Sequence, residues 1–434
     1  MFSVINRTAK RMLLRYQRGR ALVRISDTTL RDGLQTPGVR LDTAARVQIA
    51  RALAEAGVHS IDCGFPASSA AEVESIKAIA RSVKGAILMA HSRTKTEDVL
   101  LAAESLAGLS PFHRGIGLFI GVSPLHREHK LQMTKAQIVD SVVKAIDCAS
   151  KHFEIISFGA EDASRCEPEF LSEVYEKAIQ AGAISIGFTD TVGILTSGKV
   201  RDALRRIQDT VRSINDAMIG VHFHNDLGLA TANALEAIKA GAHNVQGTVN
   251  GMGERAGNTA IEEVVMALVL HREEFGKAVA VDPSKLSELS SLVTRVTGFA
   301  PSSNKAVVGR NIFRTETGLH QNGQLKHPDM YLPFQPEVIG AAPVELLLGH
   351  NSGKSAVRHH LEAAGLEPRD EHVDIILNFL KTGRHDAGDM PEVTGFLERL
   401  KPYIASGELA AACDASASAE PSGTEEESAV RHQP

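Results

Sequence analysis

Cysteine is scarce in this chain, and its spacing excludes the usual disulfide frameworks. The 434 residues contain four cysteines, Cys63, Cys148, Cys166 and Cys413, and none of them forms a C-x-x-C pair. Scattered cysteines in a chain of this length are typical of a reduced compartment. We therefore expect a cytoplasmic protein without structural disulfides.

Long apolar runs and an excess of positive charge are also missing. No apolar run approaches the ~20 residues of a membrane span, so no membrane partner is expected. The chain has 47 Lys and Arg against 52 Asp and Glu, a net charge of -5. This balance implies no basic face and argues against nucleic acid as a partner. The composition, 43% hydrophobic, is that of a globular protein with enough material for a large core.

The two ends of the chain differ from its middle. The first 26 residues carry seven Arg or Lys and no Asp or Glu. We expect residues 1–21 to form a basic N-terminal arm, and the alternative is an amphipathic organelle-targeting peptide. Residues 405–434 are small, polar and acidic, which predicts a disordered tail.

Between these ends, one pattern recurs eight times: a short apolar or β-branched run followed by a longer helical stretch. The eight runs are 23–26, 58–64, 85–90, 115–121, 153–158, 183–188, 219–224 and 244–249. Stretches such as 43–57 and 231–242 between them have helical periodicity. Eight such units over roughly 250 residues predict an α/β fold, a (β/α)8 TIM barrel over residues 22–275. The alternative, a doubly wound open sheet, is weakened because no G-x-G-x-x-G follows the first strand.

Unusual polar residues follow six of the predicted strands. The clusters are SDTTLRDGLQ (26–35), GFPASS (64–69), GAEDASR (159–165), TDTVG (189–193), HFHND (222–226) and NGMGERAGN (250–258). Catalytic residues of such barrels lie at the carboxyl ends of the strands. We therefore expect these clusters to form one catalytic rim.

Two histidines in the seventh run, His222 and His224, are one residue apart. Alternate residues of a strand face the same side, about 6.6–6.8 Å apart, so both imidazoles point one way. Asp32, after the first strand, and Asn258, after the eighth, are placed to add oxygen ligands. Two imidazoles and a carboxylate suit Mg²⁺, Mn²⁺, Zn²⁺, Fe²⁺ or Co²⁺, with positions open for substrate. The alternative is a hydrogen-bonded pair of core histidines.

Arg31 flanks the proposed ligand Asp32. A cation beside a metal site can offset negative charge on a bound oxyanion. The structural alternative is a salt bridge to a strand-end acid such as Glu161 or Glu254. The sequence alone leaves both roles open for Arg31.

Taken together, the motifs are similar to one enzyme family. DTTLRDGLQ (27–35), GFPASS, EDASR (161–165), DTVG (190–193), HFHNDLGLATAN (222–233) and NGMGERAGN occur in this order. They resemble the acetyl-CoA-dependent 2-oxo acid condensing enzymes, namely the 2-isopropylmalate, homocitrate and citramalate synthases of a metal-dependent TIM-barrel superfamily. The resemblance continues past the barrel and implies a linker or lid subdomain over 276–340 and a helical subdomain over 341–404.

The resemblance implies a reaction and a metal site. Such an enzyme adds the methyl carbon of acetyl-CoA to the ketone of a 2-oxo acid, hydrolyses the thioester and releases CoA and a 2-substituted malate. The family's metal ligands correspond to Asp32, His222 and His224, with Asn258 in or near the ligand set. Mg²⁺ or Mn²⁺ is the expected metal, with Zn²⁺ or Co²⁺ as alternatives.

The resemblance also implies the catalytic residues. Arg31 stabilises the developing alkoxide, and His320 in TGLHQNG corresponds to the family's base, supported by Glu161 or Glu254. Tyr331 corresponds to the family's tyrosine.

Substrate contacts and assembly follow from the same resemblance. Gln35 and Thr191 correspond to positions that contact the 2-oxo acid. In the family the lid subdomain covers the partner's barrel, which implies a homodimer.

The fifth strand departs from the family's pattern. Homocitrate synthases carry Arg at the position of Ser157, where isopropylmalate synthases carry Glu, and Gly159 replaces a usual serine. GFPASS and EDASR resemble the isopropylmalate branch, so a 2-isopropylmalate synthase-like enzyme is expected first. Homocitrate, citramalate and 2-phosphonomethylmalate-type synthases, with other acceptors, are the alternatives. His91 and Arg93, after the third strand, are candidates to meet an anionic acceptor tail.

Two competing functions remain. RDGLQ (31–35) is also typical of 3-hydroxy-3-methylglutaryl-CoA lyases, but those enzymes carry a cysteine in the loop after the eighth strand. Here that loop, residues 251–254, reads GMGE. A non-catalytic metal-binding paralogue would have lost a catalytic position, and the positions named above are all present.

Overall fold

The computed structural model describes residues 12, 14, 16, 18–382 and 393–411. Its chain divides into two compact units. The first unit runs to Gly309 and also includes Val338–Ala341. The second unit comprises Arg310–Glu337 and the chain from Ala342 onward. The division therefore falls at Gly309, whereas the sequence placed boundaries at 275 and 340. Residues 276–309, expected in the lid, belong to the barrel unit.

The first unit is a closed parallel barrel, as predicted. Its strands are β1 (Leu22–Asp27), β2 (Ser60–Asp62), β3 (Ile87–Arg93), β4 (Arg114–Gly121), β5 (Ile155–Glu161), β6 (Ser185–Asp190), β7 (Met218–Phe223) and β8 (Asn244–Gly247). Each strand pairs in parallel with the next, and β1 pairs with both β8 and β2, which closes the ring. A short strand, β9 (Ala278–Val279), adds to β1.

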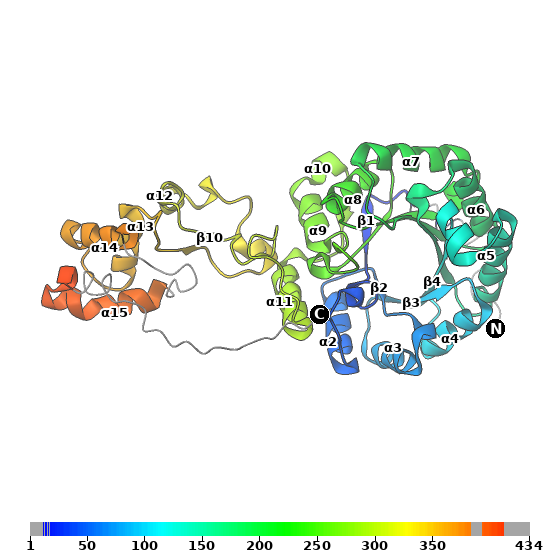
Figure 1. The fold of residues 1–434 in the computed structure, drawn as a ribbon, viewed down its shortest axis with the longest axis horizontal. Helices are drawn as coiled ribbons and strands as arrows, with labels where there is room; N and C mark the ends of the chain where they lie inside the picture. Colours follow the sequence, from blue (N-terminus) through cyan, green and yellow to red (C-terminus); the bar gives the residue numbers. More distant parts are fainter. Residues whose placement is uncertain (1–11, 13, 15, 17, 383–392, 412–434) are drawn as a thin grey trace, which may run out of the picture. The chain divides into compact units, whose positions relative to one another are not determined.

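Helices surround the strands as an outer ring (Figure 1). They are α2 (Thr43–Glu55), α3 (Ala70–Ser82), α4 (Thr96–Ser105), α5 (Lys135–Ala149), α6 (Pro168–Ala181), α7 (Ser197–Thr210), α8 (Ala230–Lys239) and α9 (Ile261–Leu270). Two further helices of this unit are α10 (Arg272–Phe275) and α11 (Leu286–Thr297).

Local sequence explains where these helices start and stop. The side chain of Asp42 accepts the backbone N–H of Ala45 and caps α2. Thr134 and Gln137 form a reciprocal capping box at the start of α5. Gly182, with a φ of 130°, ends α6 in a conformation that disfavours other residues. These turns set the loops that carry the polar clusters at the strand ends.

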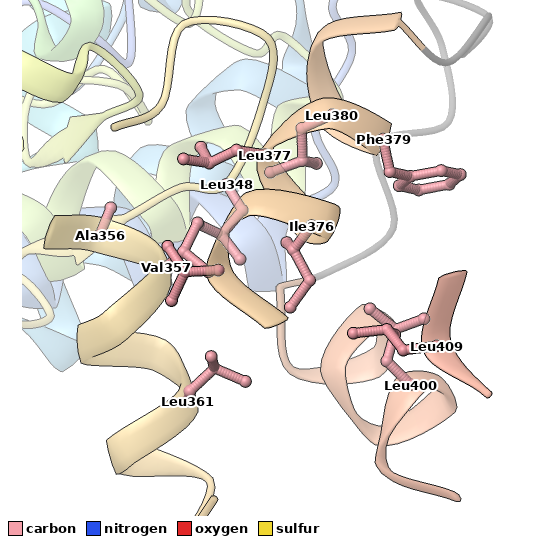
Figure 2. Packing of buried hydrophobic residues seen from close by; sticks show 11 residues of the cluster. Leu348, Ala356, Val357, Leu361, Ile376, Leu377, Phe379, Leu380, Leu400 and Leu409 are labelled. Carbon is pink, nitrogen blue, oxygen red and sulfur yellow. The ribbon is translucent and has the colours of Figure 1, made fainter. Parts of the chain in front are cut away.

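The second unit is mainly helical. It contains α12 (Gly318–Lys326), α13 (Lys354–Ala363), α14 (Asp370–Thr382) and α15 (Val393–Ser406), with a short parallel pair of β10 (Arg314–Thr315) and β11 (Glu345–Leu346). Figure 2 shows its apolar cluster, in which Val357 and Leu361 of α13 lie near Ile376 of α14. Leu409 is also buried in this cluster, so residues 405–411 do not form the disordered segment expected there.

Most of the expected N-terminal arm, and residues 412–434 of the expected tail, lie outside the described residues. Within the arm, the Arg18 guanidinium donates to the carbonyl oxygens of Ile214 and Ala217 below β7. No helix in the described part of the chain is long and apolar enough to span a membrane.

Candidate active site

The barrel encloses a cavity of about 930 Å³, lined by residues of the strands and of the loops at their carboxyl ends. All eight strands contribute to its wall. Asp32, Arg31, His222 and His224 line it, which places these predicted residues on one surface. The polar strand ends therefore meet at one rim, as the barrel prediction required.

Asp32, His222 and His224 converge in the upper part of this cavity. The Nε2 atoms of the two histidines are 3.2 Å apart, and Asp32 Oδ2 lies 3.9 and 4.0 Å from them. All three side chains are buried. One potential ligand atom from each residue lies within 4.8 Å of the others. This spacing matches the set of donors that surrounds one divalent cation.

The hydrogen bonds made by Nδ1 of both rings leave Nε2 as the nitrogen that can bind a metal. His222 Nδ1 lies 2.9 Å from Gln246 Oε1, and His224 Nδ1 lies 3.2 Å from the carbonyl oxygen of Gly257. Because both oxygens only accept, Nδ1 carries the proton in each ring and Nε2 presents its lone pair. Two lone pairs facing each other beside a carboxylate are satisfied by a cation, so the residues fit a metal.

Asn258 lies beside His224 through an isolated antiparallel bridge. Its amide nitrogen donates to Asp32 Oδ1 at 2.6 Å and to the carbonyl of Met252 at 2.9 Å. Its own Oδ1 is buried without a hydrogen-bond partner. Asn258 thus orients Asp32 and retains an oxygen for a further ligand.

Arg31 is held by two carboxylates. Its Nε donates to Asp62 Oδ2 at 2.8 Å and its Nη1 to Asp32 Oδ2 at 3.1 Å. The alternative considered from the sequence, a salt bridge to a strand-end acid, is confirmed, but the acid is Asp62 and not Glu161 or Glu254. Asp62, at the end of the neighbouring strand β2, takes that place because β1 and β2 pair directly.

Burial and charge set the protonation of this cluster. Burial raises the pKa of Asp32, but Arg31 and the two imidazoles together lower the pKa more, so it lies below its usual range. Burial, with the neighbouring His224, lowers the pKa of His222 to about 3. Burial also lowers the pKa of His224. The carboxylate is therefore ionised and both imidazoles are neutral at pH 7, the states in which they bind metals.

Four predicted substrate-binding residues line the cavity: Gln35, Thr191, Ser157 and His91. His91 stacks on Phe119, with ring centroids 4.6 Å apart. Arg93 is different, because it does not line the cavity. Its guanidinium pairs with Asp98 at 2.6 Å, and its side chain is 47% exposed. The structure does not bring Arg93 to the place where an acceptor tail would lie.

Glu161 and Glu254 also line the cavity. Glu161 accepts from Lys130 Nζ at 2.7 and 2.9 Å, and Lys130, which lines the cavity, lies in a π-helical segment, His126–Leu131. The backbone N–H of Glu254 donates to Asp32 Oδ1 at 3.5 Å. Glu254 is therefore tied to the metal cluster through its backbone.

His320 and Tyr331 lie in the second unit. His320 belongs to α12, and Tyr331 follows a short turn after it. Their rings stack with centroids 4.2 Å apart. Both side chains are exposed. The structure thus brings these two predicted residues together, at one surface of the second unit.

Sequence reasoning missed Asp62 and Gln246. Asp62 is the last residue of β2, but the predicted run 58–64 placed it inside the strand, so the strand-end rule did not select it. Gln246 gives no such signal, because its role follows from the register that sets it opposite His222. Among the described cysteines, none lines the cavity.

Family models match most of the chain. A model described as HMGL-like matches residues 22–293, and one described as homocitrate synthase post-HMGL domain-like matches residues 307–387.

Among curated proteins, the 2-isopropylmalate synthase of Pyrococcus furiosus is 41% identical over 352 residues, covering 81% of this chain and 70% of the relative. That of Methylacidiphilum infernorum is 40% identical over 358 residues, covering 82% and 71%.

Solved structures agree on the fold of the barrel. Hydroxymethylglutaryl-CoA lyase from Pseudomonas aeruginosa superimposes with a TM-score of 0.57 at 20% identity, covering 66% of this chain and 96% of the lyase. An identity this low supports the fold alone. The family models and the far more similar relatives settle the family: the chain belongs to the HMGL-like family, together with the 2-isopropylmalate synthases.

Proposed function

We propose that this protein is an acyltransferase that condenses acetyl-CoA with a 2-oxo acid and releases CoA and a 2-substituted malate. The observation that carries the proposal is the buried Asp32, His222 and His224 cluster, with Arg31 beside it in one cavity. The similarity to 2-isopropylmalate synthases supports the same reaction class. Homocitrate, citramalate and 2-phosphonomethylmalate-type reactions differ only in the acceptor.

Asp32, His222 and His224 would hold a divalent cation, with Asn258 supplying or orienting a further oxygen. Mg²⁺ or Mn²⁺ is our first choice, with Zn²⁺ or Co²⁺ as alternatives. When bound, the cation acts as a Lewis acid toward the acceptor's ketone. Gln246 and the Gly257 carbonyl hold both rings in the orientation this requires.

Arg31 stabilises the negative charge that develops on the former ketone oxygen. Its two hydrogen bonds to Asp62 and Asp32 fix the guanidinium before substrate binds. Because the Arg31 guanidinium is already held in position in a buried site, it does not have to be reoriented during the reaction. Gln35 and Thr191, which also line the cavity, contact the acceptor.

A base removes one proton from the methyl group of acetyl-CoA, and the resulting enolate carbon attacks the acceptor's oxo carbon. We assign this base to His320, stacked on Tyr331, with Glu161 or Glu254 in support. The alkoxide product takes up a proton, and water then hydrolyses the thioester and releases CoA.

We also propose that the protein works as a cytoplasmic homodimer. The exposed His320 and Tyr331, with Leu319 exposed by 78%, form a surface that suits contact with a second subunit. In this assembly the second unit of one subunit covers the barrel of its partner.

The test follows free CoA with a thiol reagent. Purified protein is incubated with acetyl-CoA, a panel of 2-oxo acids and Mg²⁺ or Mn²⁺. We expect CoA release that depends on a 2-oxo acid and stops with a chelator. Release without any acceptor, or none with every acceptor, would contradict the proposal.

A further inference from the structure

The cavity continues below the metal cluster into the centre of the barrel. Its wall includes Ile155, Ile184 and Met218 at the amino ends of β5, β6 and β7. Layers of side chains usually fill the interior of a (β/α)8 barrel. Here one open space runs from His222 toward the floor, and its volume of about 930 Å³ is near the upper end for ligand pockets.

Three glycines account for the missing layer. Gly159 of β5, Gly187 of β6 and Gly220 of β7 are direct neighbours in the strand register and line the cavity. We call them the glycine row. His222, a ligand candidate, is the next inward-facing residue above Gly220. The row therefore lies directly beneath the proposed metal site.

Neither backbone conformation nor close packing requires glycine at these positions. None of the three has a left-handed φ, and a Cβ added to any of them would meet no atom closer than 3.4 Å. Glycine in a strand interior costs roughly 0.5–1 kcal/mol relative to alanine. What the three residues provide is open volume under the metal.

The wall beside the glycine row is apolar or uncharged, whereas Arg24 and Glu154 line the cavity at its floor. Phe119, in register with Gly159, faces the row together with Met89 and Leu34. Burial lowers the pKa of His91 to about 4, so the ring stacked on Phe119 is uncharged at neutral pH.

The cations of the upper cavity already have carboxylate partners. Arg31 pairs with Asp62 and Asp32, Lys130 with Glu161, Arg255 with Asp226, and Arg46 with Glu72. A second carboxylate on the acceptor would therefore find these cations already paired with carboxylates of the protein. Arg24 lies lower, at the amino end of β1, two inward positions from the rim.

We infer that the acceptor is a 2-oxo acid with a bulky, uncharged side chain that descends from the metal site over the glycine row. This inference rests on the proposed function and names its substrate class. Because two positions along a strand span about 6.6–6.8 Å, the side chain carries about four to seven carbons beyond the oxo carbon.

The test compares kcat/KM for five acceptors, using the full chain loaded with Mg²⁺ or Mn²⁺ and following CoA release. The acceptors are pyruvate, 3-methyl-2-oxobutanoate, 2-oxoglutarate, 2-oxo-octanoate and phenylpyruvate. We expect 2-oxo-octanoate or phenylpyruvate to exceed pyruvate at least ten-fold. Preference for pyruvate, 3-methyl-2-oxobutanoate or 2-oxoglutarate overturns this inference and leaves the proposed reaction standing. No release with any acceptor overturns the proposed function, and this inference falls with it.

Two cavity-filling variants, Gly159→Val and Gly187→Val, test the position of the side chain. Each should lower the ratio of kcat/KM for phenylpyruvate over pyruvate at least ten-fold, and should weaken phenylpyruvate binding measured by calorimetry without acetyl-CoA. The matched control is Gly108→Val, at an exposed glycine with no atom near its added Cβ, which should keep the ratio. If a valine variant fails to fold by circular dichroism, the alanine variant replaces it. An unchanged ratio in folded variants at both positions overturns the inference.

Discussion

The Nε2 atoms of His222 and His224 face each other at 3.2 Å, while each Nδ1 is bound to a separate acceptor. Neither ring can turn away without losing that acceptor. The two rings are thus held so that both nitrogen lone pairs can bind one metal ion.

Replacing one ring should therefore remove the metal. We expect His222→Ala to weaken Mn²⁺ binding by more than the roughly 10- to 100-fold typical of changes behind the ligands. Equilibrium dialysis measures the affinity, and condensing activity should fall with it. His129→Ala, at an exposed histidine, is the control that keeps the metal. Full metal content in His222→Ala would show that the ligand assignment is wrong.

Gln246 offers a finer test because it touches only the far side of the His222 ring. Gln246→Leu removes the acceptor that fixes the ring and its tautomer. We expect Mn²⁺ affinity to fall about 10- to 100-fold. Gln246→Glu keeps an oxygen at that position and should bind the metal at least as well as wild type. Equal losses in both variants would point to general damage at this site.

The sequence predicted the barrel and the convergence of Asp32, His222 and His224 because both follow from local rules. A period of two sets His222 and His224 on one face, and the order of strands in a closed barrel puts Asp32 near them. The partner of Arg31 and the glycine row depend instead on which residues stand opposite each other on adjacent strands. This register between neighbouring strands is a property of the closed barrel, so it cannot be read from the sequence of any one strand.

Domain boundaries were less predictable for a similar reason. Residues 276–309 read as part of a separate subdomain, yet α11 packs on α2 and joins the barrel unit. The small, polar composition after 405 hid Leu409, whose burial depends on a cluster formed by helices earlier in the chain. The average composition of a segment does not reveal a single buried residue such as Leu409.

Asp62 should affect catalysis without affecting the metal. Asp62→Asn leaves an oxygen near Arg31 Nε but removes the charge that holds the guanidinium. A hydrogen bond between charged groups contributes about 1.5–3 kcal/mol, so we expect kcat to fall about 10- to 100-fold. Mn²⁺ affinity should stay within about three-fold of wild type, since Asp62 is not among the ligands. Loss of metal in this variant would mean that Asp62 supports the cluster rather than Arg31 alone.

The second unit should lose stability through its own core. Leu361 of α13 is fully buried, and Leu361→Ala leaves a cavity that we expect to cost about 2–5 kcal/mol. Calorimetry should show a lower unfolding temperature for this unit, while Mn²⁺ binding in the barrel is retained. Leu325→Ala, at a side chain 40% exposed, is the matched control and should change stability little. Loss of Mn²⁺ binding in Leu361→Ala would show that the two units do not unfold separately.

His243 should make the barrel less stable in mild acid. The ring is buried, its Nδ1 accepts the backbone N–H of Ile219 at 3.2 Å, and burial, with Arg18, lowers its pKa to about 3. In the unfolded chain the pKa of histidine is about 6.5. Below that pH His243 is therefore protonated in the unfolded state but remains neutral in the folded state. Stability is therefore complete above pH 6.5 and is lost as the pH falls toward 3. Between pH 7 and pH 5 this histidine should cost about 1–2 kcal/mol.

The variant His243→Asn isolates this effect, because its amide oxygen can accept the same backbone N–H without titrating. Urea unfolding at pH 7 and pH 5 gives the free energy of unfolding for both proteins. We expect the variant to lose about 1–2 kcal/mol less than wild type over this interval. His129→Asn, at an exposed histidine, should follow wild type. If His243→Asn loses as much as wild type, the folded protein accommodates a protonated ring at this position, and the acid sensitivity belongs to other groups.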